Sequence, residues 1–182
     1  MGLIPIQKNA AGLNVIRYTR RGTRVADTVA AVSPDGFSMN SLLDIKKNKK
    51  VIAVLPAYNA ERTLEQTVRE IPREWVDDIL LVDDASQDRT WEVAQQLGVA
   101  TVRHPKNRGY GGNQKTCYAE ALKRGADIVL MVHPDYQYDP ALIPRLIEPL
   151  LLNKCDAVFG SRMLGGQFIK GGMPLWKFYG NI

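Results

Sequence analysis

A histidine and a carboxylate stand two positions apart at the end of a short apolar run. The run covers residues 129–132, and His133, Pro134 and Asp135 follow it directly. Imidazole nitrogen and carboxylate oxygen are both ligands of divalent metal ions. The residues by themselves therefore leave two interpretations open, a metal site or an ordinary exit from a strand into a loop.

Other polar residues with possible chemistry also follow apolar runs. Asp83 and Asp84 end a second run, where a carboxylate can accept a hydrogen bond from a ligand or cap the turn that follows. The stretch GYGG (109–112) lies between Arg108 and Lys115. Glycine lets a backbone approach a ligand closely, and a helix that starts there offers N–H groups to phosphate. A flexible surface loop is the other explanation of these glycines.

These residues must be positioned by a regular succession of strands and helices that begins at Val51. Short apolar runs predict the strands, and apolar residues at helical spacing predict the helices between them. Such alternation indicates an α/β domain with a mostly parallel sheet and helices on both faces, which binds ligands beyond the carboxyl ends of its strands. The expected strands are 51–55, 79–82, 99–102, 128–132 and 157–160, and the expected helices are 61–71, 89–97, 112–123 and 141–152.

The segment before this domain, residues 1–50, is expected to be an irregular basic extension with room for a short strand or helix. It holds nine Lys and Arg against three Asp, whereas residues 51–182 hold fifteen basic and sixteen acidic groups. The run IKKNKK (45–50) suits contact with nucleic acid or acidic lipid, but a solvated charge run is the preferred interpretation. We expect no nucleic-acid partner.

The composition excludes several other classes of protein. With 45% hydrophobic and 24% charged residues in 182, the chain is typical of a globular protein. The most apolar stretch, residues 142–152, is too short for a transmembrane helix and carries charges and prolines. The N-terminus lacks the features of a secretory signal. The two cysteines, Cys117 and Cys155, predict reduced thiols in a cytosolic protein.

Five stretches, in this order, resemble the nucleotide-sugar half of family 2 glycosyltransferases, most closely the polyprenyl-phosphate type that includes dolichyl-phosphate mannose synthase: PAYNAERTL (56–64), VDDASQDRT (82–90), NRGYGGNQKT (107–116), HPDYQYDP (133–140) and GSRMLGG (160–166). The resemblance covers residues 51–182 and implies the Rossmann-like GT-A fold. Members of the family continue through further elements, so we expect an incomplete acceptor side in this chain.

The resemblance also implies which residues form the site. HPD falls where the family usually has Asp-x-Asp, so Asp135 and Gln137 are expected to hold Mg²⁺ or Mn²⁺, and His133 is a departure from the pattern. Asp84 is chosen over Asp83 to accept a hydrogen bond from the base, while Asp83 caps the turn. Glu61 is left out, because Ala60 stands where the family often has its acidic residue. The residues expected to bind a GDP- or UDP-sugar donor are Pro56, Ala57, Tyr58, Asp84, Gly109, Gly111, Lys115 and His133.

On the acceptor side, Arg162, Lys177 and Asn181 are expected to bind a lipid phosphate, and Asp135 and Arg162 are the expected catalytic residues. The stretch PLWKFYGN (174–181) resembles the acceptor-side helix of the lipid-phosphate enzymes. Its aromatic residues suit peripheral contact with a membrane or, equally, packing in a core.

The function implied is inverting transfer of a sugar from a nucleotide diphosphate to a polyprenyl or dolichyl phosphate. We expect a cytoplasmic protein at the membrane face, acting in cell-envelope glycan synthesis. The alternative is a non-catalytic or truncated nucleotide-sugar-binding module, which would bind a donor without forming product. A dinucleotide-dependent dehydrogenase is disfavoured because no G-x-G-x-x-G follows the first strand. Nucleotidyl transfer is disfavoured because PAYN replaces a glycine- and lysine-rich loop.

Overall fold

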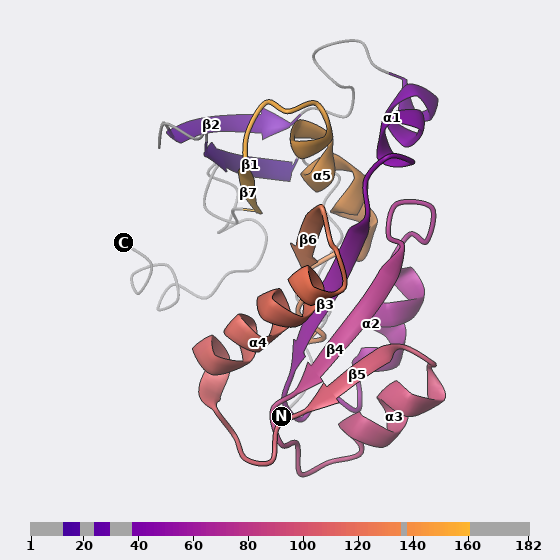
Figure 1. The fold of residues 1–182 in the computed structure, drawn as a ribbon, viewed down its shortest axis with the longest axis vertical. Coiled ribbons are helices and arrows are strands. Elements are labelled where there is room, and N and C mark those ends of the chain that lie inside the picture. Colours follow the sequence, from indigo (N-terminus) through magenta and orange to yellow (C-terminus); the bar gives the residue numbers. More distant parts are fainter. Residues whose placement is uncertain (1–12, 19–23, 30–37, 136–137, 161–182) are drawn as a thin grey trace, which may run out of the picture. The chain divides into compact units, whose positions relative to one another are not determined.

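The structure is a computed structural model that describes residues 13–18, 24–29, 38–135 and 138–160, and it divides into two compact units (Figure 1). One unit is formed by residues 39–147 and contains a four-stranded sheet. The other combines residues 1–38 with 148–182 and contains a three-stranded sheet. All expected site residues up to Asp135 belong to the first unit, so each unit is described by itself.

The four-stranded sheet is parallel throughout, with the strand order β5-β4-β3-β6. All residues of the inner strand β3 (Val51–Ala57) are buried, as its continuous apolar sequence requires of a strand covered on both faces. The other strands are β4 (Asp78–Asp83), β5 (Ala100–Arg103) and β6 (Ile128–Met131). The predicted α/β fold with a mostly parallel sheet is confirmed.

Helices cover both faces of this sheet. In Figure 1, α4 (Gly109–Lys123) lies on one side, and α2 (Leu64–Glu70) and α3 (Thr90–Gln96) lie on the other. Alternate residues of β3 and β4 point toward α4, as the two-residue period of a strand dictates. The buried cluster on the α4 side consists of Ile52, Val54, Leu80, Val82, Cys117 and Ala121.

Helix α4 begins three residues earlier than the sequence predicts, at Gly109 instead of residue 112. Glycine inside a helix is less favourable than alanine by about 1 kcal/mol, so GYGG gives no local sign of a helix. The start is stabilised by Asn107, whose Oδ1 accepts a hydrogen bond from the Gly109 N–H at 2.9 Å. Residues 109–112 therefore form the first helical turn, and the N–H groups of residues 108–111 have no partner within the helix.

The last expected strand, β7 (Ala157–Gly160), is present, but its predicted place in the parallel sheet is wrong. It pairs antiparallel with β1 (Leu13–Tyr18), which also pairs antiparallel with β2 (Arg24–Val29). A four-residue apolar run indicates a strand but not the strand it joins. Its partner lies in the segment expected to be an irregular extension with room for a short strand or helix, and the described residues of that segment include these two strands.

The remaining helices precede the first strand or follow the last strand of the parallel sheet along the chain. Helix α1 (Met39–Lys46) lies within the expected extension. The predicted helix at 141–152 is a 3-10 turn, η1 (Pro140–Leu142), that continues into α5 (Ile143–Leu151). None of the described helices is both long and apolar enough to cross a membrane.

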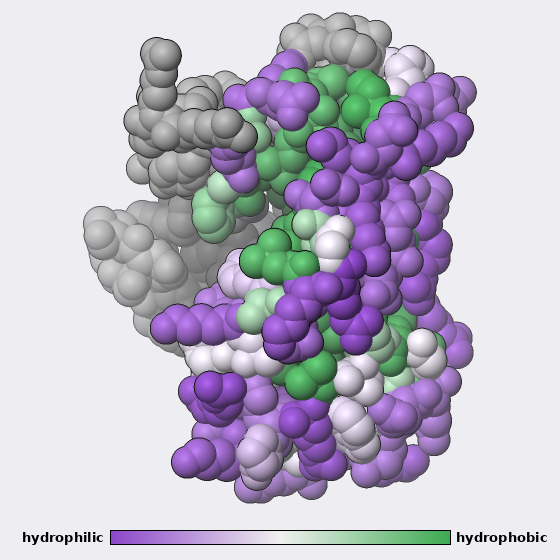
Figure 2. All heavy atoms as spheres, viewed as in Figure 1, coloured by the Kyte–Doolittle hydropathy of each residue, from purple (hydrophilic) through white to green (hydrophobic). Residues whose placement is uncertain are grey.

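The visible face of the parallel-sheet unit is mainly hydrophilic, with small separate hydrophobic areas (Figure 2). Three of the large exposed side chains in this unit are tyrosines at the edge of the sheet where the expected site lies. They are Tyr58, Tyr110 and Tyr138.

Candidate functional site

Loops meet at the carboxyl edge of the parallel sheet, where the sequence analysis expects a site. Neighbouring strand ends are tied together by backbone hydrogen bonds at this edge. The N–H of Asp84 donates to the carbonyl of Ala57, and the N–H of His104 donates to the carbonyl of Asp83, each at 2.9 Å. The loops after β3, β4 and β5 thus leave the sheet side by side.

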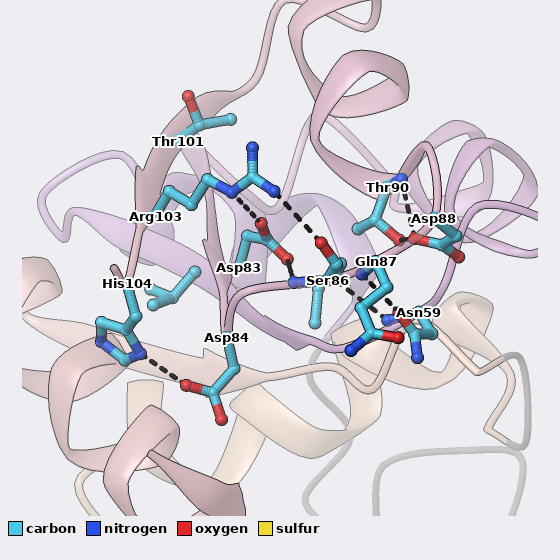
Figure 3. A network of polar contacts seen from close by, with 12 residues as sticks. Asn59, Asp83, Asp84, Ser86, Gln87, Asp88, Thr90, Thr101, Arg103 and His104 are labelled. Carbon is cyan, nitrogen blue, oxygen red and sulfur yellow. Dashed lines mark hydrogen bonds and ion pairs between the residues drawn. The ribbon is translucent and has the colours of Figure 1, made fainter. Parts of the chain in front are cut away.

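Asp83 shapes the loop after β4. Its side chain is fully buried, its Oδ1 accepts a hydrogen bond from the Ser86 N–H at 3.1 Å, and its Oδ2 forms an ion pair with Nε of Arg103 at 3.0 Å (Figure 3). Arg103 also donates to the carbonyl of Ser86 and lies over the ring of Trp91. Both oxygens of Asp83 therefore hold the turn, in the capping role expected for this residue.

Asp84 has a different environment. Its side chain is only 3% exposed, and both hydrogen bonds that it accepts from described residues end on Oδ1. The donors are the backbone N–H of Arg108 at 2.9 Å and Nδ1 of His104 at 2.7 Å. A carboxylate only accepts hydrogen bonds, so Nδ1 of His104 carries a hydrogen. In Figure 3, Oδ2 of Asp84 points away from the imidazole, which leaves this oxygen for a further donor.

His104 is a residue of the site that the sequence analysis missed. It is buried, and its Nε2 lies 2.9 Å from Oγ1 of Thr116 on α4. The imidazole therefore connects Asp84 to the first turns of α4. Its position was a usable signal, because His104 directly follows β5 in the way that Asp84 directly follows β4.

The loops after β3 and β4 are fastened to each other. The N–H of Asn59 donates to Oγ of Ser86, and the N–H of Gln87 donates to Oδ1 of Asn59, both at 2.9 Å. Asn59 and Ala85 adopt left-handed φ angles of 52° and 59°. For alanine this conformation is unfavourable, so the surrounding hydrogen bonds hold the loop in a strained shape.

A second set of hydrogen bonds joins the same two loops further from the sheet. The N–H of Glu61 donates to Oδ2 of Asp88 at 3.1 Å, and the N–H of Arg89 donates to Oε2 of Glu61 at 3.0 Å. The N–H of Ala60 donates to Oγ1 of Thr90 at 2.7 Å. Glu61 thus takes part in fastening the loop after β3 to the loop after β4.

Asn113 is a second residue that the sequence analysis missed. It is buried on α4, and its Nδ2 donates to the carbonyl of Val82 at 3.0 Å and to that of Ala57 at 3.4 Å. The side chain thereby joins the ends of β3 and β4 to the helix. The spacing of the buried residues could have indicated it, because Asn113, Cys117 and Ala121 follow one another at intervals of four and so share one face of the helix. A polar residue on that buried face needs hydrogen-bond partners.

The glycines of α4 have different requirements. Gly109 has a φ of +74°, and a Cβ on Gly112 would come within 2.8 Å of the Cβ of Arg108. A Cβ on Gly111 would meet nothing within 4 Å, so the fold leaves open space above this residue. Lys115 is exposed one turn further along the helix. Backbone N–H groups, open space and a cation suit a phosphate group.

The side chain of His133 is held by Tyr110. The Tyr110 hydroxyl lies 3.1 Å from Nε2 of His133, the two rings stack with centroids 5.5 Å apart, and Gln114 donates to the hydroxyl at 2.6 Å. The Tyr110 hydroxyl thus accepts from Gln114 and shares a second hydrogen bond with Nε2 of His133. Burial raises the pKa of Tyr110, and the negative charge of Asp135 adds to this effect. The HPD turn and the start of α4 therefore form one cluster.

Asp135 is exposed at this turn. The preceding residue is fixed by Thr63, whose hydroxyl donates to the carbonyl of Pro134. Among the residues that the structure describes, no group of three or more His, Cys, Asp or Glu side chains is placed to hold a metal ion. One carboxylate is nevertheless a fitting donor for Mg²⁺ beside a diphosphate, since such ions take further ligands from phosphate and water.

The other expected site residues are placed as follows. Pro56 and Ala57 are buried at the end of β3, and Tyr58 is 50% exposed directly after it. The described part of the site therefore brings the expected donor-binding residues to one edge of the sheet. Four expected residues lie outside the described residues: Gln137, Arg162, Lys177 and Asn181.

Comparison with known proteins identifies the relatives of this chain. The model of glycosyl transferase family 2 matches residues 52–180. A UDP-N-acetylglucosamine–dolichyl-phosphate N-acetylglucosaminyltransferase of Methanococcus voltae is 30% identical over 152 residues, which cover 74% of this chain and 60% of that protein. A dolichol-phosphate mannosyltransferase of Pyrococcus furiosus is 34% identical over 138 residues, covering 71% of this chain and 37% of that protein.

The comparison extends to bacterial proteins. An undecaprenyl-phosphate mannosyltransferase of Micrococcus luteus is 31% identical over 128 residues, covering 66% of this chain and 51% of that protein. This chain thus spans 37% to 60% of the length of these curated relatives.

Solved structures show the same fold. Glucosyl-3-phosphoglycerate synthase of Mycobacterium tuberculosis, in complex with Mn²⁺, UDP and phosphoglyceric acid, matches with a TM-score of 0.55 and 26% identity. The match covers 67% of this chain and 45% of that one. The GT-A type of α/β fold expected from the sequence is confirmed. Since the family model matches most of the chain and the ordered motifs agree with it, this protein belongs to glycosyl transferase family 2.

Proposed function

We propose that this chain carries the donor-binding part of a glycosyltransferase that moves a sugar from a nucleotide diphosphate to a polyprenyl or dolichyl phosphate. The observation that carries the proposal is the environment of Asp84. This buried carboxylate accepts two hydrogen bonds on Oδ1, and its Oδ2 points away from the imidazole of His104. It lies at the edge where α/β sheets bind nucleotides. The proposed ligand of the second oxygen is an N–H group of the donor base.

The diphosphate is proposed to lie against the first turn of α4. The N–H groups of this turn, the open space over Gly111 and the charge of Lys115 support this placement. Asp135 and Gln137 are the proposed holders of Mg²⁺ or Mn²⁺, which would neutralise charge on the leaving diphosphate. A related structure contains Mn²⁺ together with UDP.

The proposed reaction is a single displacement with inversion. A phosphate oxygen of the acceptor attacks the anomeric carbon, the bond from that carbon to the diphosphate oxygen breaks, and the nucleoside diphosphate departs with the bonding electrons. The acceptor phosphate is already anionic, so no strong general base is required. Arg162, Lys177 and Asn181 are proposed to bind this phosphate, with Arg162 and Asp135 as the catalytic residues.

The acceptor class is supported by the relatives, three of which are named for transfer to dolichol or undecaprenyl carriers. Polyprenyl phosphates reside in membranes, so we propose that the protein works at the cytoplasmic face of a membrane through peripheral contact. Synthesis of a cell-envelope glycan is the proposed context.

One observation favours a second candidate, a nucleotide-sugar-binding module without turnover. The HPD turn has one carboxylate fewer than Asp-x-Asp, and Nε2 of its histidine is occupied by the Tyr110 hydroxyl. A weakened metal site would retain donor binding but lose stabilisation of the leaving group.

The test is a transfer assay with labelled UDP- and GDP-sugars, undecaprenyl phosphate in detergent, and Mn²⁺, combined with calorimetry of donor binding. We expect a labelled lipid product from the native chain, reduced about a hundredfold in Asp135→Ala. Asp44→Ala is the matched control, because Asp44 lies on the exposed face of α1, where its carboxylate forms an ion pair with Lys47. Donor binding without product would support the second candidate, and a folded chain that binds no donor would contradict both.

A further inference from the structure

We propose that His104 is a specificity-determining residue that makes the donor site select uracil over guanine. The inference rests on the proposed function and names the base of its donor. The side chain of His104 is buried, and its two ring nitrogens form hydrogen bonds with Asp84 and Thr116. The hydrogen bond that joins the ends of β4 and β5 comes from the backbone N–H of His104. The fold therefore does not require an imidazole to hold these strand ends together.

The Asp84 carboxylate can accept only a limited number of hydrogen bonds. Each carboxylate oxygen offers about two lone pairs to hydrogen-bond donors. On Oδ1 both are used, by the Arg108 N–H at 2.9 Å and by Nδ1 of His104 at 2.7 Å. No described residue donates to Oδ2, although the side chain is 3% exposed. The site therefore presents one accepting oxygen to a ligand, with its direction fixed by the imidazole.

The nucleotide bases differ in the hydrogen-bond donors that they present to a carboxylate. Guanine presents two parallel donors, the ring N1–H and the exocyclic amine, which match a carboxylate only when both of its oxygens are available. Uracil presents one ring N–H between two carbonyl groups, which matches a single oxygen. Cytosine places an accepting ring nitrogen beside its amine, so this nitrogen would face the carboxylate oxygen without a hydrogen between them.

A base other than uracil would fit this site poorly. With Oδ1 saturated, guanine would leave one buried donor without an acceptor, and a buried polar group without a partner strongly disfavours the complex. We therefore expect the chain to bind UDP at least about tenfold more tightly than GDP or CDP. Calorimetric titration of each nucleotide with Mn²⁺ on the full chain measures this ratio.

The role of His104 is tested by a matched pair of variants. His104→Asn keeps an N–H donor near the position of Nδ1, whereas His104→Leu keeps apolar bulk and removes the donor. We expect the UDP-to-GDP affinity ratio to fall about tenfold in His104→Leu and to stay within about threefold of the native ratio in His104→Asn. A merely structural role would weaken both nucleotides by the same factor in both variants, leaving the ratio unchanged, and would overturn the inference.

Asp84→Asn gives a second measurement that does not alter the histidine. The donors from Arg108 and His104 both require an oxygen at the Oδ1 position, so the amide nitrogen must take the place of Oδ2. The site would then present a donor, and we expect UDP to lose affinity relative to CDP by about tenfold or more. An unchanged UDP-to-CDP ratio, or native binding of GDP as tight as that of UDP, would overturn the inference. Absence of all nucleotide binding to the folded native chain would instead refute the proposed function.

Discussion

The backbone N–H of Asn59 donates to Oγ of Ser86, 27 residues away, while the Asn59 side chain accepts from the N–H of Gln87. The two residues lie on loops that follow different strands, so these hydrogen bonds make the loops after β3 and β4 one structural unit. That unit carries Tyr58 and Asp84, two residues proposed to meet the donor base. The geometry of the base site therefore depends on residues that need not touch the base.

We expect Ser86→Ala to lower the free energy of unfolding by about 1 kcal/mol, because the N–H of Asn59 loses its acceptor in a partly buried hydrogen bond. Urea denaturation followed by circular dichroism measures the change. The control is Gln87→Ala, which removes an exposed side chain while its backbone N–H still donates, and which we expect to change stability by less than about 0.5 kcal/mol. Equal stability of the two variants would show that the hydroxyl does not hold the loops together.

Asp88 predicts a pH dependence of stability. Burial acts to raise the pKa of this carboxyl, but hydrogen bonds from the Thr90 hydroxyl and from nearby N–H groups outweigh burial and lower it. A lowered pKa in the folded state stabilises the protein above the unfolded value of about 3.9. This contribution is lost as the pH falls through the lower, folded value.

Asp88→Asn should therefore be less stable than the native chain at pH 7, and the difference should shrink as the pH falls below about 4. Denaturation midpoints of both proteins between pH 7 and pH 3 measure this. The amide retains one oxygen but cannot accept at both of the positions that Oδ1 and Oδ2 occupy now. A difference that stays constant over this range would argue against a role for the ionised carboxylate.

The strands of the parallel sheet could be predicted because burial on both faces demands continuous apolar runs, and β3 is such a run. The start of α4 could not be predicted so well, because glycines at 109, 111 and 112 disfavour a helix locally while Asn107 and the sheet stabilise one. The pairing of β7 with β1 involves residues more than a hundred positions apart. Nothing in a four-residue strand indicates so distant a partner.

For the site, too, local sequence predicts some residues, whereas contacts between distant residues decide others. The sequence analysis prefers Asp84 to Asp83 as the residue that meets the base, which stays a prediction, and the two carboxylates differ in their hydrogen bonds. His104 and Asn113 were missed because their roles arise from contacts with distant residues, His104 with Asp84 and Asn113 with the carbonyl ends of two strands. The only local indication of these roles in the sequence is that His104 directly follows a strand and that Asn113 lies among buried residues of a helix.

Cys117 predicts a thiol that is inert in the folded chain. Burial raises its pKa to about 12, and the thiolate is the reactive form. In a Cys155→Ala background we expect no labelling of Cys117 by a disulfide reagent at pH 8, and complete labelling in urea. The raised pKa also means that stability is lost as the pH rises above about 9 toward the folded value. Cys117→Ala should lack this alkaline loss, and rapid labelling of the folded chain would contradict the burial of the thiol.

Asn113 supports a prediction about how α4 holds the strand ends. Asn113→Leu replaces the amide by an apolar group of similar size, which leaves the carbonyl of Val82 without its 3.0 Å hydrogen bond in a buried position. We expect a loss of about 1–3 kcal/mol in the free energy of unfolding, measured by urea denaturation. The control is Ala119→Ser on the exposed side of the same helix, which changes only helix propensity and should cost about 0.5 kcal/mol.

The same variant separates support of the fold from support of the site. The Ala57 carbonyl accepts from both Asn113 and the N–H of Asp84, so loss of the amide should loosen the strand ends that precede Tyr58 and Asp84. We expect UDP affinity to fall several-fold in Asn113→Leu under conditions where the chain remains folded. Unchanged affinity in a destabilised variant would show that Asn113 stabilises the sheet without positioning the base site.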